Sequence, residues 1–129
     1  MIVVDASAVI ELLLNTVAGV RIGARLLSSG ETLHAPHLID LEVAQVLRRY
    51  ARSGELDAPR GAQALDDLAS LAIHRYPHNV LLSRIWELRD NVTAYDAAYI
   101  ALAEALDAPL VSCDSALTSS VHRARVEVV

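Results

Sequence analysis

The chain has 129 residues, of which 53% are hydrophobic and 21% are charged, a composition that fits one folded domain and excludes a disordered chain. Its formal net charge of -5 predicts a surface that repels nucleic acid unless metal ions and a local arginine patch intervene. No apolar run approaches the ~18 residues of a membrane span and no signal peptide is indicated, so we expect a soluble, cytoplasmic, single-domain protein over residues 1–129 with no membrane partner.

The hydrophobic pattern alternates between strands and helices along the chain. In order, it predicts a strand at 2–4, helices at 7–14 and 19–27, a strand at 32–36, helices at 37–53 and 56–71, a strand at 72–77, helices at 78–89 and from 93 to a stop at 107–109, and strands at 110–114 and 126–129. Ser7 is the expected N-cap of the first helix, residues 28–30 close the second, Gly54 ends the third, and Asp57 with Pro59 begins the fourth. Strands separated by helices indicate an α/β fold, a three-layer α/β/α sandwich with a central, mainly parallel sheet.

Four acidic side chains are expected at one edge of this sheet. Asp5 and Asp114 directly follow predicted strands, and Asp96 lies near the start of the helix that begins at residue 93. Glu42 lies in the first turns of its helix, at the border of the apolar face. Because ligands of open parallel sheets bind beyond the carboxyl ends of the strands, these acids are candidates for one shared site.

The charge of such a group has a chemical consequence. Four carboxylates at close range repel one another, and the chain contains no lysine to neutralise them. Oxygen ligands favour hard cations, so Mg²⁺ or Mn²⁺ is the expected cofactor. Such a site suits hydrolysis of phosphodiester bonds. Taken singly, each acid is also explained as a helix cap or as a solvated charge.

Hydroxyl and basic side chains extend the candidate site. Ser7 and Thr93 are placed to position substrate or water, although each also suits a helix cap or turn. A cluster of three arginines, Arg48, Arg49 and Arg52, suits the C-terminal end of its helix and is the first candidate for contact with the phosphates of a nucleic acid. Asp40 falls about 200° from Glu42 on the helix wheel, so it is left out of the site.

Three stretches of the chain resemble the acidic motifs of a known family. "VVDASAVIELL", "APHLIDLEVAQVLRR" and "NVTAYDAAYIALAEALDAPLVSCD" are similar to motifs of the PIN-domain ribonucleases, in particular the VapC toxins of bacterial toxin–antitoxin pairs. The resemblance spans nearly the whole chain. It implies a PIN-like α/β/α sandwich and an endoribonuclease that cuts RNA with Mg²⁺ or Mn²⁺.

The resemblance also assigns residues and partners. The metal-site acids of the family fall on Asp5, Glu42, Asp96 and Asp114, which the resemblance makes both catalytic and metal-binding. The small hydroxyl residue after the first acid and the threonine before the third match Ser7 and Thr93. Family members are usually homodimers. They are held inactive by a VapB antitoxin, which commonly places a basic side chain in the acidic pocket.

Two other functions use similar chemistry. A non-catalytic module could bind a basic partner peptide in the same acidic cleft, since a cleft can bind arginine without cutting anything. A metal-dependent phosphatase of the haloacid-dehalogenase type would need a second aspartate two residues after Asp5 and a helical lysine, but the chain has Ser7 there and no lysine. Cleavage of RNA by the purified chain separates these alternatives.

Overall fold

Five parallel strands form the centre of the molecule in this computed structural model, which describes residues 1–28, 30–118 and 121–129. The strands lie in the order β3-β2-β1-β4-β5, and each neighbouring pair is parallel. Their bounds are Ile2–Val4 (β1), Leu33–Pro36 (β2), Ile73–Tyr76 (β3), Leu110–Ser112 (β4) and Val126–Val128 (β5). The parallel sheet predicted from the sequence is therefore confirmed, and all carboxyl ends lie at one edge.

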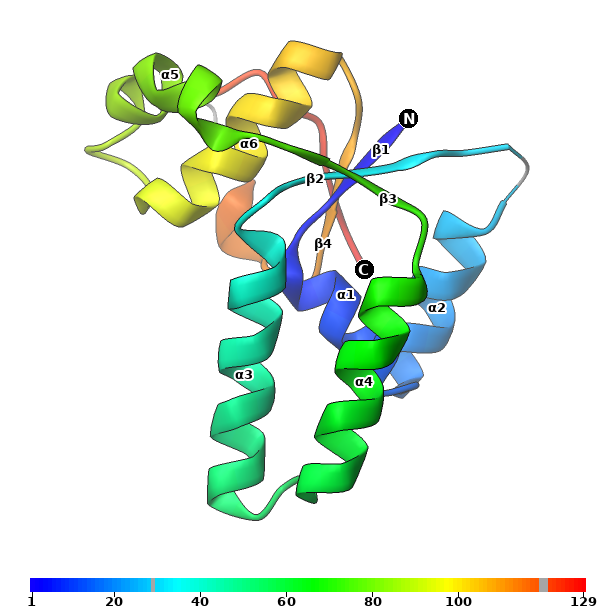
Figure 1. Cartoon of the computed structure of the whole chain (residues 1–129). Helices are drawn as coiled ribbons and strands as arrows, with labels where there is room; N and C mark the ends of the chain where they lie inside the picture. The colour runs from blue at the N-terminus through cyan, green and yellow to red at the C-terminus, as the bar shows by residue number, and fades with distance from the viewer. Residues whose placement is uncertain (29, 119–120) are drawn as a thin grey trace.

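The helices cover both faces of the sheet (Figure 1). They are α1 (Ala6–Leu13), α2 (Val17–Leu26), α3 (Ile39–Ser53), α4 (Ala58–Ser70), α5 (Leu82–Glu87) and α6 (Ala94–Leu106), with short 3-10 segments η1 (His78–Leu81) and η2 (Ser115–Leu117). The chain runs outward from β1 through β2 to β3 and then returns across the sheet to β4. Because parallel crossovers are right-handed, α1 to α4 cover one face and α5 and α6 cover the other.

The return crossover creates a switch point between β1 and β4. Strand order reverses there, and ligands of open α/β sheets bind at the carboxyl ends of the strands at such a point. The backbone holds the two strands in register, with Val4 opposite Val111. The residues that follow β1 and β4, including Asp5 and Asp114, therefore emerge side by side.

Helix α6 is part of the core rather than a surface helix. Its residues 97–103 are all buried, and four of these seven are alanines. Small side chains let the helix approach the sheet closely, where Ile2, Val3 and Val4 are fully buried. This packing fixes the position of the N-terminus of α6, which carries Asp96.

A close approach also fixes the angle between α1 and α2. A Cβ atom added at Gly19 would lie 2.0 Å from the carbonyl oxygen of Glu11, so only glycine fits there.

Among the described residues, no single helix is long and apolar enough to span a membrane, and α1 with α2 meets that test only as a pair bent by 109°.

Several predicted helix ends need correction. The N-cap of α1 is Asp5 rather than Ser7, because the carboxylate accepts a hydrogen bond from the Ala8 N–H at 3.0 Å. Helix α2 begins two residues before the predicted start, with Thr16 as its cap. The helix predicted at 78–89 is instead η1 followed by α5, which ends at Glu87. Gly54 ends α3 in a left-handed conformation, as predicted, whereas the predicted stop at 28–30 includes residue 29, which lies outside the described residues.

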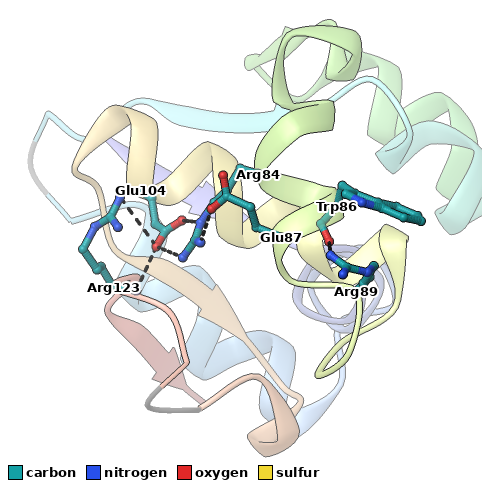
Figure 2. Close-up of polar contacts among 6 residues, drawn as sticks. All are labelled: Arg84, Trp86, Glu87, Arg89, Glu104 and Arg123. Atoms are coloured by element: carbon teal, nitrogen blue, oxygen red, sulfur yellow. Dashed lines mark hydrogen bonds and ion pairs between the residues drawn. The ribbon is translucent and has the colours of Figure 1, made fainter.

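A buried carboxylate joins α5, α6 and the C-terminal segment (Figure 2). The Glu104 side chain is only 3% exposed and accepts two hydrogen bonds from the Arg84 guanidinium, at 2.8 and 3.0 Å. The Arg123 backbone N–H donates to the same carboxylate at 2.8 Å. These bonds satisfy a charge that would otherwise be costly to bury.

Candidate active site

The main cleft of the molecule opens at the carboxyl edge of the sheet and has a volume of about 940 Å³. Its walls come from α1, α3, the N-terminal part of α6 and the segment after β4. Four acidic side chains from separate parts of the chain line it: Asp5, Glu42, Asp96 and Asp114. The cleft therefore lies at the switch point between β1 and β4, where the topology favours a ligand.

Asp5 is held rigidly at the base of the cleft and is only 6% exposed. Its Oδ1 accepts hydrogen bonds from the Ser7 hydroxyl at 2.7 Å and from the Ala8 N–H, and its Oδ2 accepts one from the Ser112 hydroxyl at 2.5 Å. Burial raises the pKa of the Asp5 carboxyl above its usual range, although these hydrogen bonds oppose the rise. The orientation of this carboxylate is thus set before any ligand binds.

Two serine hydroxyls connect the ends of β1 and β4. The Ser7 hydroxyl oxygen accepts from the Cys113 N–H at 3.0 Å and lies 3.3 Å from the Ser112 hydroxyl oxygen. Ser112 is fully buried, and its oxygen accepts from the Asp114 N–H at 2.9 Å. Asp114 in turn caps η2 by accepting from the Ala116 N–H. The network fixes the start of η2 relative to Asp5.

Glu42 is positioned by a tyrosine of α6. The Tyr99 hydroxyl donates to Glu42 Oε1 at 2.6 Å, and the tyrosine ring is buried. Burial raises the pKa of the Glu42 carboxyl, and repulsion from Asp96 and Asp5 adds to the rise, whereas the Tyr99 bond opposes it. Burial and the neighbouring carboxylates also raise the pKa of the Tyr99 hydroxyl, so Tyr99 stays protonated and acts as a donor.

Asp96 lies in the first turn of α6. Its backbone N–H donates to the Thr93 hydroxyl oxygen at 3.2 Å, which makes Thr93 the N-cap of that helix. Burial raises the pKa of the Asp96 carboxyl, and repulsion from Asp114 and Asp5 raises it further. Carboxylates that raise one another's pKa must lie close enough to interact electrostatically, so the acids of the cleft form one interacting group.

Comparison with known proteins places the chain in a family. Residues 2–120 match the PIN domain family. The chain belongs to that family. Ribonuclease VapC9 of Mycobacterium tuberculosis is 49% identical over 120 residues, which cover 93% of this chain and 91% of the relative. Ribonuclease VapC12 of the same organism is 40% identical over 100% of this chain and 99% of its own length. The predicted resemblance to VapC-type PIN proteins is confirmed.

Solved structures support the same fold. The crystal structure of PAE2754 from Pyrobaculum aerophilum has a TM-score of 0.71 and 26% identity, over 97% of this chain and 81% of that chain. That of M. tuberculosis VapC20, described as a Sarcin-Ricin loop cleaving toxin, has a TM-score of 0.62 and 17% identity, over 91% and 92% of the two chains. The three-layer PIN-like sandwich predicted from the sequence is confirmed.

The cleft of this PIN domain brings together most of the predicted site residues. Besides the four acids, Ser7, Arg48 and Arg49 line it, whereas Thr93 and Arg52 lie outside its lining. As the side chains stand, no three acidic, histidine or cysteine side chains of residues 1–28, 30–118 and 121–129 lie close enough to form a complete metal site. The carboxylates thus share a cleft, and a common ion would require their side chains to move so that the oxygens meet on it.

Two residues of the network were not among the predicted site residues. Ser112 bonds Asp5 from a strand that is distant in sequence, and no local pattern signals such a contact. Tyr99 could have been found, because it lies three residues after Asp96 and therefore on the same side of the helix. Asp40, which helix geometry excluded, instead pairs with Arg75 at 2.8 Å.

Proposed function

We propose that this chain is a metal-dependent endoribonuclease that acts as the toxin of a VapBC-type toxin–antitoxin pair. The single observation that carries the proposal is the cleft lined by four carboxylates from four separate segments of a PIN domain. Relatives with 40–49% identity over most of the chain are named VapC ribonucleases. The substrate that follows is an RNA strand, cut by hydrolysis of a phosphodiester bond.

Mg²⁺ or Mn²⁺ is the cofactor that fits these residues. Asp5, Glu42, Asp96 and Asp114 provide only oxygen ligands, which hard cations prefer. Three of the four have a raised pKa that comes in part from mutual repulsion, so a cation among them would relieve that repulsion. When bound, the ion would polarise the phosphate and promote ionisation of the attacking water.

The other residues of the cleft orient these ligands. Ser7 already donates to Asp5 and accepts from the Cys113 N–H, so it acts as a positioning residue rather than as a direct phosphate contact. Tyr99 holds Oε1 of Glu42, and Oε2 accepts no hydrogen bond from residues 1–28, 30–118 or 121–129. Thr93 caps α6 and thereby fixes the first turn, from which Asp96 projects. Such outer partners commonly change metal affinity or activity about 10- to 100-fold when they are removed.

The RNA strand is proposed to run along α3. Arg48 and Arg49 are exposed, line the cleft and form no ion pair within the described part of the chain. At 1.5 Å per residue, they lie roughly 9–10 Å along the helix axis from Glu42. They are therefore available for backbone phosphates on either side of the scissile bond. Arg52, one turn further along, is a candidate for a more distant phosphate.

The proposed partners follow from the family. A VapB-like antitoxin would inhibit the enzyme by placing a basic side chain among the four carboxylates. We also propose a homodimer and a cytoplasmic location. Neither affects the chemistry of the cleft.

The decisive experiment measures RNA cleavage by the purified, partner-free chain in Mg²⁺ or Mn²⁺. We expect cleavage of structured RNA that is abolished by chelator and by Asp96→Asn. Asp90→Asn is the matched control, because Asp90 is an exposed acid outside the cleft, and this variant should cut like the wild type.

Each other result would support a different mechanism or function. Cleavage that persists in chelator would refute the metal-dependent mechanism. Inactivity on all RNAs would favour a module that only binds a basic peptide. Release of phosphate from small esters would indicate a phosphatase.

A further inference from the structure

An exposed aromatic ring lies beside the carboxylates. Tyr95 is the second residue of α6, directly before Asp96, and its side chain is 64% exposed. It lines the cleft together with Leu41 of α3, which is 76% exposed. Within the described parts of the chain, the Tyr95 ring and hydroxyl have no hydrogen-bond, ring or cation partner. Ligand sites are lined mainly by apolar and aromatic side chains, so an unpartnered ring at this cleft is a candidate ligand contact.

The other highly exposed ring is different. Trp86, at 68% exposure, is covered by the Arg89 guanidinium, whose central carbon lies 4.7 Å from the ring centroid (Figure 2). Arg89 also donates to the Trp86 carbonyl oxygen at 2.9 Å, which holds the cation over the ring. Trp86 is not part of the cleft lining. Its exposure is thus explained within the chain, whereas that of Tyr95 is not.

The other residues of the cleft indicate which kind of ligand would contact Tyr95. The same cleft holds the four carboxylates, where a phosphate would be cut, and Arg48 and Arg49 of α3, which offer positive charge to further phosphates. A ligand that combines several phosphates with apolar, flat groups is a nucleotide strand. Single-stranded RNA is recognised by unstacked bases that stack on aromatic side chains.

We propose that Tyr95 is a stacking platform for a nucleobase adjacent to the scissile phosphate, with Leu41 as the apolar rim next to it. The proposal rests on the ribonuclease function proposed above. It makes Tyr95 a binding and specificity residue, because the strength of stacking depends on the base that reaches the ring. The Tyr95 hydroxyl has no role in this contact.

The experiment first maps the bond that the wild-type enzyme cuts and then uses short single-stranded RNAs that span it. One RNA is intact, and the others each lack a single base next to the cut while keeping the backbone. We expect Tyr95→Ala to lower kcat/KM on the intact RNA by about 5- to 150-fold, mainly through KM. Tyr95→Phe should retain wild-type values. Because the ring is exposed, neither variant should change Tm appreciably.

The base-deleted RNAs test the contact itself. Deleting the base that stacks on Tyr95 should lower the kcat/KM of the wild type by about the same factor as Tyr95→Ala does on the intact RNA. The same deletion should lower the kcat/KM of Tyr95→Ala little further, because that variant has already lost the contact. Trp86→Ala is the matched control and should cut all the RNAs like the wild type. Wild-type cleavage with an unchanged kcat/KM in Tyr95→Ala would overturn the stacking proposal and leave the proposed function standing. Absence of cleavage by the wild type would refute the proposed function and this inference with it.

Discussion

Tyr99→Phe isolates the contribution of one hydrogen bond to the geometry of the acidic cleft. The variant keeps the buried ring and removes only the hydroxyl that donates to Glu42 Oε1 at 2.6 Å. A hydrogen bond to a charged group contributes about 1.5–3 kcal/mol. Because Glu42 is only half-buried, water can replace part of this bond, and we expect a loss of about 1–2 kcal/mol in the free energy of unfolding. For a chain of 129 residues this corresponds to a Tm lower by about 4–7 °C.

The same change should lower activity, because Glu42 would no longer be oriented. We expect kcat/KM on RNA to fall about tenfold or more, as is typical when an outer partner of a metal ligand is removed. Tyr76→Phe is the control, since its hydroxyl makes an equally short bond of 2.6 Å, but to His34 Nδ1 and outside the cleft. That variant should lose stability and keep kcat/KM.

Steady-state cleavage is measured on the wild type, Tyr99→Phe and Tyr76→Phe. Thermal unfolding is measured on these proteins and also on Glu42→Ala and on Tyr99→Phe in a Glu42→Ala background. If the hydroxyl acts through Glu42, its removal should cost much less in that background. An undiminished loss in the double variant, or a Tyr99→Phe enzyme as active as Tyr76→Phe, would refute the reasoning.

Three further predictions concern the fold. Gly19→Ala should lower the free energy of unfolding by about 3 kcal/mol or more in denaturant titrations, because the new Cβ would lie 2.0 Å from the Glu11 carbonyl oxygen and must displace backbone. Glu104→Gln should lower the free energy of unfolding by about 1.5–3 kcal/mol, seen as a lower Tm, because it removes the buried charge that accepts two hydrogen bonds from the Arg84 guanidinium, although Arg84 keeps its pair with Glu87. His34 should contribute a loss of stability as the pH drops below 6.5, measured as the difference between the wild type and His34→Gln, because burial, and then the charges of a neighbouring histidine and the chain amino group, lowers the pKa of His34 from that value. The folded state therefore binds this proton less readily than the unfolded state, and acid favours unfolding.

Matched variants control each of these measurements. Gly23→Ala lies on the same helix, where the added Cβ would meet only the end of the Leu12 side chain at 3.4 Å, so little stability should be lost. Glu87→Gln removes an acid that also pairs with Arg84 but is 62% exposed, and Tm should stay within about 2 °C. His37→Gln removes an exposed imidazole and should keep the acid dependence. Equal losses in variant and control would contradict the corresponding explanation.

Local signals in the sequence predicted the sheet and most of the helices. The period of the apolar residues in α3 and the glycine that follows it predicted both the helix and its end at Gly54. The end of β1 was also predictable, because Asp5 interrupts a short apolar run, whereas β4 ends at Ser112, two residues before the predicted end at Asp114. In a parallel sheet these positions must share an edge, which is why the acids of the cleft could be named in advance.

Local sequence patterns could not predict the contacts between segments that are distant in the chain. Ser112 lies within a short strand, and only the pairing of β4 with β1 brings its hydroxyl to Asp5. Ser7 was expected to cap α1, but the cap is the more buried Asp5 carboxylate. The Ser7 hydroxyl instead accepts a hydrogen bond from the Cys113 N–H. Both η1 and α5 pack against α6, and the break between them was not predicted from the pattern of residues 78–89.

The most direct test of the acidic cleft is calorimetric titration of the metal-free chain with Mn²⁺, because it measures ion binding without RNA or catalysis. The wild type should bind, Asp5→Asn and Asp96→Asn should each bind at least about tenfold more weakly, and Asp90→Asn should bind like the wild type. Equal affinity in all four proteins would contradict the claim that the carboxylates of the cleft hold a common ion.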